Sequence, residues 1–132
     1  MKIAVATDDG QIVSRHFGRA AHYAVLTVEN GSVVGRELRD KFSPHATGTG
    51  EAHEDVPGYA HGTDPAAQSR HNQMAAAIAD CEVLLCGGMG MGAYQSMAAN
   101  GIRPVVTDIE DVEIAALECA AGRIVDHVEK LH

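Results

Sequence analysis

Three runs of apolar residues in the first part of the chain predict β-strands. The first run spans residues 2–7 and is followed by polar, turn-forming residues. The second and third runs, at 22–29 and 32–39, are separated only by Asn30-Gly31, a dipeptide that favours the tight turn of a β-hairpin. The pattern therefore predicts one strand, a polar connection, and then two antiparallel strands.

The second part of the chain alternates between helical and strand patterns. Asp64 and Pro65 have the residue types of an N-cap and of a first helical position. A strand–helix–strand unit places its strands parallel and joins them by a right-handed crossover. We therefore predict an α/β fold with a mixed sheet of about five strands and helices on both faces. The predicted elements are a helix from Pro65, a strand at 82–86, a helix at about 91–100, a strand at 103–107 and a helix at 112–121.

Residues 41–65 interrupt this regular pattern. They have no hydrophobic period and are rich in glycine, proline, histidine and acidic residues. An irregular segment of this length in a compact domain is usually functional or disordered. The chain of 132 residues has the size of one domain, so residues 1–132 are predicted to form a single domain with one long loop. Residues 122–132 are amphipathic, and their pattern fits either a short helix or an arm.

The charge of the chain narrows the classes of partner. The formal net charge is −8, which repels nucleic-acid phosphates and anionic membranes. No apolar stretch approaches the roughly 18 residues that a membrane span needs. The N-terminal run has the pattern of a strand and not of a signal peptide. We therefore expect a cytoplasmic protein with no nucleic-acid partner and no membrane partner.

Histidine is the unusual residue of this chain, with eight copies. His16 lies in the segment SRHFGRA between the first two predicted strands, where a neutral imidazole is a good ligand for a transition metal. Arg15 and Arg19 flank it in an acidic chain and would offset the negative charge of a sulfide cluster. The alternative is a loop histidine that only caps local backbone.

The irregular segment contributes further histidines, His45, His53 and His61, at intervals of eight. Neighbouring glycines and acidic residues would allow several imidazoles to gather around a metal, which would then order the loop. The spacing matches no standard zinc pattern, so a polar loop that happens to be rich in histidine is the alternative. His71 falls on the same apolar helix stripe as Met74, which favours a buried histidine slightly over a ligand.

The glycine-rich segment after the strand at 82–86 has two interpretations. Gly88, Gly90 and Ala93, with Asp108 after the next strand, match the dinucleotide-binding fingerprint. Too few residues follow Asp108 for a complete nucleotide-binding half. The same glycines would also let backbone amides at a helix N-terminus approach an anionic cluster. Cys86, at the strand end, is either an inert buried thiol or a thiolate within reach of a metal.

The remaining side chains do not suggest catalysis. Cys81, Cys86 and Cys119 are odd in number and form no CxxC pair, which argues against disulfides and a zinc ribbon. Asp8 and Asp9 follow the first strand, but no lysine-containing phosphate loop accompanies them. We therefore predict that the protein is not an enzyme.

The segments KIAVATDD, SRHFGRAAHYAVLTVENG and ADCEVLLCGGMGMGAYQSMAANGIRPV together resemble the dinitrogenase iron–molybdenum cofactor biosynthesis family, over roughly residues 1–121. The resemblance implies a ribonuclease-H-like, three-layer α/β/α fold with a mixed five-stranded sheet. It also implies a non-enzymatic carrier or scaffold for iron–molybdenum cofactor, its precursor or a related metal–sulfur cluster, with His16 as a cluster ligand. The long, histidine-rich loop departs from the family's pattern, so a simple metal ion is an alternative cargo.

The sequence thus predicts a binding protein with a metal–sulfur cluster or transition-metal ion as cargo. A donor or recipient protein of cluster assembly is the expected partner, and an exposed hairpin edge would allow a homodimer. The alternatives are a nucleotide-binding protein and a regulatory partner protein without a ligand. The candidate metal ligands are His16, His45, His53, His61, His71 and Cys86, with Arg19, Gly88 and Gly90 as further cofactor-binding residues.

Overall fold

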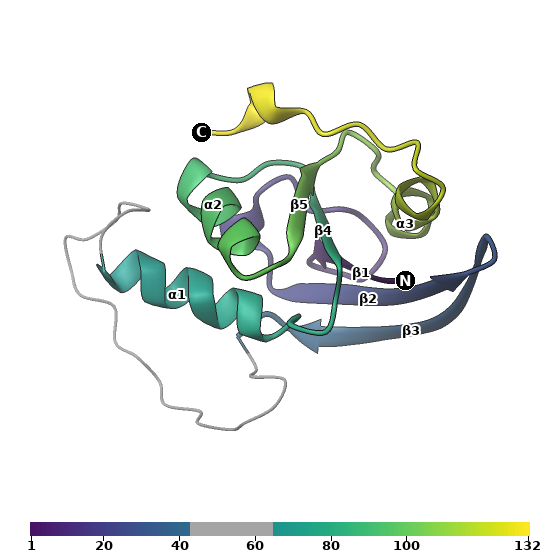
Figure 1. Ribbon diagram of the computed structural model, residues 1–132, viewed down its shortest axis with the longest axis horizontal. Coiled ribbons are helices and arrows are strands. Elements are labelled where there is room, and N and C mark those ends of the chain that lie inside the picture. The colour runs from purple at the N-terminus through teal and green to yellow at the C-terminus, as the bar shows by residue number, and fades with distance from the viewer. Residues whose placement is uncertain (43–64) are drawn as a thin grey trace.

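A mixed five-stranded sheet forms the centre of the protein (Figure 1). The computed structural model describes residues 1–42 and 65–132. The strand order is β3-β2-β1-β4-β5, and the prediction of a mixed five-stranded sheet is confirmed. The strands are β1 (Lys2–Thr7), β2 (His22–Glu29), β3 (Ser32–Asp40), β4 (Val83–Cys86) and β5 (Arg103–Val106).

The first strand of the chain lies at the centre of this sheet. β1 pairs antiparallel with β2 and parallel with β4, while β4 pairs parallel with β5. The predicted hairpin joins β2 to β3, and its turn residues Asn30 and Gly31 have φ angles of 52° and 77°. Both angles lie in the left-handed region that a tight hairpin turn requires, which explains the Asn-Gly pair.

Side chains alternate between two cores on the two faces of the sheet. In β1, Ala4 and Ala6 belong to the core beneath α1 (Pro65–Ala76) and α2 (Met91–Ala99). Ile3 and Val5 belong to the core beneath α3 (Val112–Ala120). The predicted helices therefore cover both faces of the sheet, as Figure 1 shows. The ribonuclease-H-like assignment stays a prediction.

Three details differ from the pattern-based boundaries or lie beyond them. α1, whose end the sequence pattern did not define, stops at Ala76, and the buried Ile78 lies in the turn that follows it. The predicted N-cap Asp64 lies outside the described residues. Residues 122–132 form an extended arm that contains a short 3-10 helix, Val128–Lys130, and end beside the start of α2.

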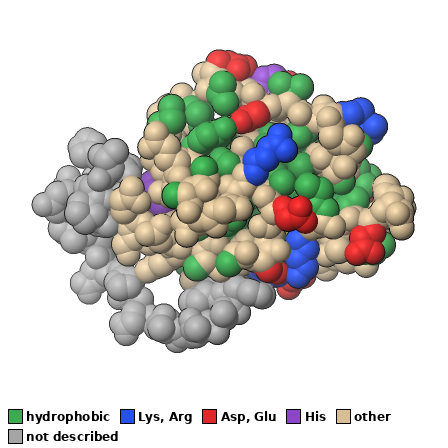
Figure 2. Space-filling view, in the orientation of Figure 1, with side chains coloured by type: hydrophobic (Ala, Val, Ile, Leu, Met, Phe, Trp, Pro, Cys, Tyr) green, Lys and Arg blue, Asp and Glu red, His purple; other side chains and the backbone are tan. Residues whose placement is uncertain are grey.

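The distribution of charged side chains on the surface fits the expectation, from the net negative charge, that nucleic acid is not a partner. On the face seen in Figure 2, acidic and basic side chains are interspersed and no continuous basic patch is visible. Among the described residues, no helix has the length and apolar character to cross a membrane.

A hydroxyl of the α1–α2 core gives a first test of the packing. Tyr23 on β2 is fully buried, and its hydroxyl donates to the Met74 carbonyl of α1 at 2.9 Å. Tyr23→Phe removes the donor and leaves that carbonyl buried without it, so we expect a loss of about 1–3 kcal/mol in the free energy of unfolding. Urea denaturation followed by circular dichroism measures this loss, and an unchanged midpoint would contradict it.

Candidate functional site

The SRHFGRA segment, residues 14–20, forms a compact turn that we call the histidine turn. Its middle is a short 3-10 helix, Phe17–Arg19, which starts immediately after His16. Phe17 is 1% exposed and anchors the turn in the core. The polar connection predicted between the first two strands is therefore tied down by an aromatic side chain, which fixes where the neighbouring His16 lies.

The histidine turn is hydrogen-bonded to the glycine-rich turn at 87–90, which we call the glycine turn. The Phe17 N–H donates to the Gly88 carbonyl at 2.9 Å, and the Gly87 N–H donates to the Ser14 carbonyl at 2.7 Å. A Cβ atom at Gly88 would lie 2.5 Å from the backbone oxygen of Arg15. Only glycine permits this approach. The position of an added Cβ at Gly88 therefore faces the histidine turn, Gly88 does not line the cavity described below, and its role in binding a cofactor stays a prediction.

Lys41 contacts the histidine turn from its buried side. It is fully buried, its Nζ donates to the Phe17 carbonyl, and Nζ lies 4.3 Å from the centroid of the Phe17 ring. Burial lowers the pKa of this ammonium group to about 8, so it keeps its proton at neutral pH. The sequence pattern placed Lys41 at the beginning of the irregular loop and gave no sign of this role.

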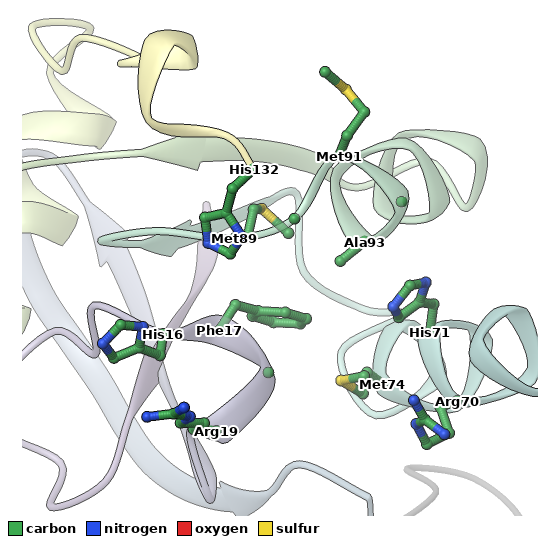
Figure 3. A pocket seen from close by; sticks show the side chains of 13 residues that line it. His16, Phe17, Arg19, Arg70, His71, Met74, Met89, Met91, Ala93 and His132 are labelled. Atoms are coloured by element: carbon green, nitrogen blue, oxygen red, sulfur yellow. The ribbon is translucent and has the colours of Figure 1, made fainter. Parts of the chain in front are cut away.

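A cavity of about 430 Å³ lies between the histidine turn, α1 and the beginning of α2 (Figure 3). His16 and Arg19 contribute from the histidine turn, and Arg70 and His71 from α1. Among the described residues, no Asp or Glu side chain lines it, although the chain as a whole has a net charge of −8. The cavity is thus a local concentration of imidazole and guanidinium groups. Further lining comes from Phe17, Met74, Met89, Met91 and His132.

His71 on α1 makes a polar contact with α2 beside the cavity. Its Nδ1 atom lies 3.5 Å from Ser96 Oγ, and that hydroxyl donates to Gln68 Oε1 at 3.2 Å. The tautomer of His71 decides whether Nδ1 donates or accepts at this contact, and a neutral imidazole is a common metal ligand in either tautomer. His71 is partly buried, so its position is intermediate between the core histidine and the ligand that the sequence left open.

The structure brings together some of the predicted site residues and separates others. His16, Arg19, His71 and Gly90 all line the cavity. Cys86 does not line it; the side chain is fully buried, and desolvation raises the pKa of its thiol to about 12. His45, His53 and His61 lie outside the described residues. Within residues 1–42 and 65–132, no three His, Cys, Asp or Glu side chains gather closely enough to hold a single metal ion.

The dinucleotide alternative receives less support. The N–H of Met91, at the start of α2, donates to the backbone oxygen of His132 at 2.8 Å and is not open to a pyrophosphate. Asp108 lines a separate, smaller cavity of about 70 Å³ beside Arg15 and Lys130. The acidic residue that would bind a ribose is therefore not at the same cavity as Gly90.

Two polar lining residues were not predicted. Arg70 precedes His71 on α1, and a helical assignment alone does not reveal which polar residue faces a neighbouring turn. His132 comes from the amphipathic arm, whose path the pattern left open. Its position depends on contacts with the glycine turn, more than forty positions earlier, and no local signal encodes such contacts.

The sequence matches the family described as dinitrogenase iron-molybdenum cofactor over residues 1–122. The chain belongs to this family. A curated relative in Frankia alni, the FeMo cofactor biosynthesis protein NifB, is 25% identical over 116 residues, which cover 87% of this chain. The chain spans 20% of the length of that relative. The resemblance stated from the sequence is therefore confirmed at the level of the family.

Solved structures share the fold of this family member. The apo form of the orange protein from Desulfovibrio gigas is 24% identical, with a TM-score of 0.62 and coverage of 93% of this chain and 89% of that chain. A protein of Methanocaldococcus jannaschii is 11% identical, with a TM-score of 0.59 and coverage of 94% and 91%. The identities are low, so these two likenesses concern the fold alone.

Proposed function

We propose that the protein is a non-enzymatic carrier or scaffold that binds an anionic metal–sulfur cluster in the cavity between the histidine turn and α1. One observation carries the proposal: His16 and His71, from segments far apart in the sequence, line one cavity together with Arg19 and Arg70. A bond from imidazole to metal is about 2 Å long, so a cavity of about 430 Å³ offers much more room than one ion needs. Its size and basic lining suit a polynuclear, negatively charged cargo.

Each group has a distinct role in this proposal. His16 and His71 are the metal ligands, and the guanidinium groups of Arg19 and Arg70 balance the negative charge of sulfides. Gly90 contributes to the lining of the cavity through its backbone. Phe17, which is almost completely buried, keeps water out from below. The histidines outside the described residues, His45, His53 and His61, remain proposed additional ligands.

The nature of the cargo rests on the family. Iron–molybdenum cofactor, a precursor or a related cluster is the proposed cargo, and a simple transition-metal ion is the alternative. The curated relative is named as a cofactor biosynthesis protein, which fits exchange with a donor or recipient protein. We place this exchange in the cytoplasm. A homodimer through the edge strand β3 is a further proposal, since Val34 and Leu38 are exposed on that strand.

Binding of defined metal–sulfur species tests the proposal. Purified protein is treated without oxygen with Fe²⁺ plus sulfide, and in a separate experiment with tetrathiomolybdate. Bound metal is measured by elemental analysis and visible absorption after gel filtration. For the species formed from Fe²⁺ plus sulfide, we expect His16→Ala to weaken binding at least about tenfold, because a lost metal ligand removes more than about 1.4 kcal/mol.

His22→Ala is the matched control, because His22 lies on β2 and does not line the cavity. We expect this variant to bind like the wild type. Equal metal content in the wild type and in His16→Ala would contradict the role given to His16. A wild type that binds neither species would overturn the proposed function for metal–sulfur cargo.

A further inference from the structure

Residues 123–132, which we call the strap, lie beyond the part of the chain that matches the family. The strap leaves the end of α3, passes the carboxyl end of β5 and reaches the start of α2 (Figure 1). Ile124 packs against the core beneath α3, and Leu131 packs against the core beneath α1 and α2. The strap thus crosses from one layer of the protein to the other and ends at the cavity.

The first polar anchor of the strap is Asp126. Its carboxylate accepts hydrogen bonds from the Val106 N–H and from the Tyr94 hydroxyl, both at 2.8 Å. The next residue, His127, donates its N–H to the Val106 carbonyl at 2.8 Å. These bonds attach the strap to the last residue of β5 and to α2, so its direction towards the cavity is fixed.

The second anchor is the backbone of His132. Its N–H donates to the Met89 carbonyl at 3.2 Å, and its backbone oxygen accepts from the Met91 N–H at 2.8 Å. A Cβ atom at Gly90 would lie 3.4 Å from that oxygen, so glycine suits this close contact. Because the anchor uses only backbone atoms, the imidazole takes no part in it. Figure 3 shows the His132 ring at the cavity, beside Met89.

We propose that the strap is a working part of the binding site and that His132 is a third imidazole ligand for the cargo. This inference rests on the proposed function, since it assumes that the cavity holds a metal–sulfur species. His16 coordinates from the histidine turn, His71 from α1 and His132 from the strap, so the cargo is held from three walls.

The anchoring of the strap explains why a third ligand would matter for retention. A ligand that is already positioned adds binding energy without the further cost of ordering a mobile side chain and its backbone. The backbone bonds of His132 and the carboxylate of Asp126 supply this positioning. His132 is therefore expected to slow the release of the cargo.

His132→Ala tests the inference with little risk to the fold, because the bonds that anchor the residue come from its backbone. The protein reconstituted without oxygen with Fe²⁺ plus sulfide is separated by gel filtration, and the iron that stays bound, measured at once and after a series of delays, gives the extent of loading and the rate of release. We expect at least about tenfold weaker binding and faster release for His132→Ala. His127→Ala is the matched control from the same strap, since its ring does not line the cavity, and we expect wild-type values for it.

The outcomes separate the two proposals. If the wild type binds and His132→Ala binds within twofold of it, the inference about His132 is overturned and the proposed function stands. If the wild type does not bind, both are overturned. Nuclear magnetic resonance of ¹⁵N-labelled histidine adds a second measurement on the wild type. Reconstitution with Fe²⁺ plus sulfide should shift or broaden the ring signals of His16, His71 and His132 but leave those of His22 and His127 in place.

Asp126→Ala tests whether the strap acts by positioning His132. The variant keeps the imidazole but loses the carboxylate that accepts from Val106 and Tyr94. We expect less bound iron after reconstitution with Fe²⁺ plus sulfide, and a double variant with His132→Ala that binds no more weakly than His132→Ala alone. Fully additive losses would show that Asp126 acts independently of His132 and would overturn the positioning role.

Discussion

Gly88→Ala is expected to lower the free energy of unfolding by about 2–4 kcal/mol and to displace the histidine turn. The added Cβ atom would lie 2.5 Å from the backbone oxygen of Arg15, and backbone cannot move aside as a flexible side chain can. The hydrogen bond from the Phe17 N–H to the Gly88 carbonyl is made at this same approach. Urea denaturation measures the loss, and the iron retained after reconstitution with Fe²⁺ plus sulfide should fall because His16 moves with the turn.

Gly18→Ala is the matched control for this prediction. Gly18 lies in the histidine turn itself, but no atom lies within 4 Å of the position of its added Cβ. A change within about 0.5 kcal/mol is therefore expected. Equal urea midpoints for Gly88→Ala and the wild type would show that the two turns separate without cost. The close approach of their backbones would then not be what positions His16.

Much of the fold could be predicted because its signals are local. The run at 2–7 and the Asn30-Gly31 turn define a strand and a hairpin within a few residues of each other, and both are confirmed. The strand–helix–strand order after residue 82 requires parallel pairing, which the sheet has. The predicted ends of the two later helices lie within one residue of the observed ends, at Ala99 and Ala120, whereas the pattern did not define the end of α1 at Ala76.

The candidate site could be predicted only in part, for a physical reason. His16 stood out because its neighbours in the sequence include arginines, and the glycine-rich segment stood out by composition. Lys41 and His132 gave no such signal. Lys41 contacts the Phe17 carbonyl and ring, and His132 contacts the glycine turn. In both cases the partners lie far apart in the sequence, and the local pattern of hydrophobic residues does not indicate such contacts. Contacts of this kind become visible only when the fold places distant segments side by side.

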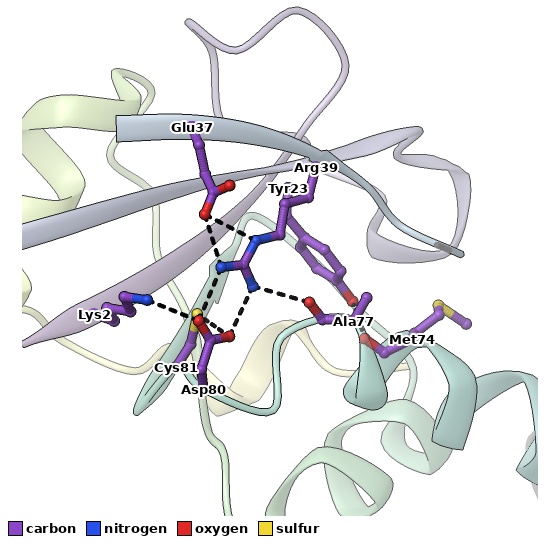
Figure 4. Close-up of polar contacts among 8 residues, drawn as sticks. All are labelled: Lys2, Tyr23, Glu37, Arg39, Met74, Ala77, Asp80 and Cys81. Carbon is purple, nitrogen blue, oxygen red and sulfur yellow. Dashed lines mark hydrogen bonds and ion pairs between the residues drawn. The ribbon is translucent and has the colours of Figure 1, made fainter. Parts of the chain in front are cut away.

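A second large effect is expected from the charged groups that join β3 to the end of α1 (Figure 4). The Arg39 side chain is only 10% exposed, and it donates to both oxygens of the Asp80 carboxylate, at 2.7 and 2.8 Å. Arg39 also donates to the Ala77 carbonyl at 3.0 Å, and Lys2 donates to Asp80 at 2.9 Å. The Asp80 carboxylate thus holds together β1, β3 and the turn after α1.

Asp80→Asn is expected to lower the free energy of unfolding by about 2–4 kcal/mol at pH 7. The loss of one partner from a buried ion pair costs about 3–5 kcal/mol, and the lower range applies because a quarter of the Asp80 side chain is exposed. Glu37→Gln is the matched control: Glu37 accepts from the same guanidinium group but is 55% exposed, so a loss below about 1 kcal/mol is expected. Equal losses in the two variants would contradict the importance of burial.

The pH dependence of the stability difference between the wild type and Asp80→Asn distinguishes an ionic effect from a packing effect. Hydrogen bonds from Arg39, and then from Lys2, hold the pKa of the Asp80 carboxyl far below its usual value of 3.8, although partial burial opposes them. The folded state therefore binds this proton less readily than the unfolded state. The stabilisation is complete above about pH 5, begins to fall as the pH drops below about 4, and is lost fully only at the folded-state pKa, which lies well below pH 3. In urea denaturation from pH 7 to pH 3, the gap between the wild type and Asp80→Asn should thus narrow only at the acidic end. A gap that stays constant down to pH 3 would mean that packing, and not the charge of Asp80, stabilises this corner of the protein.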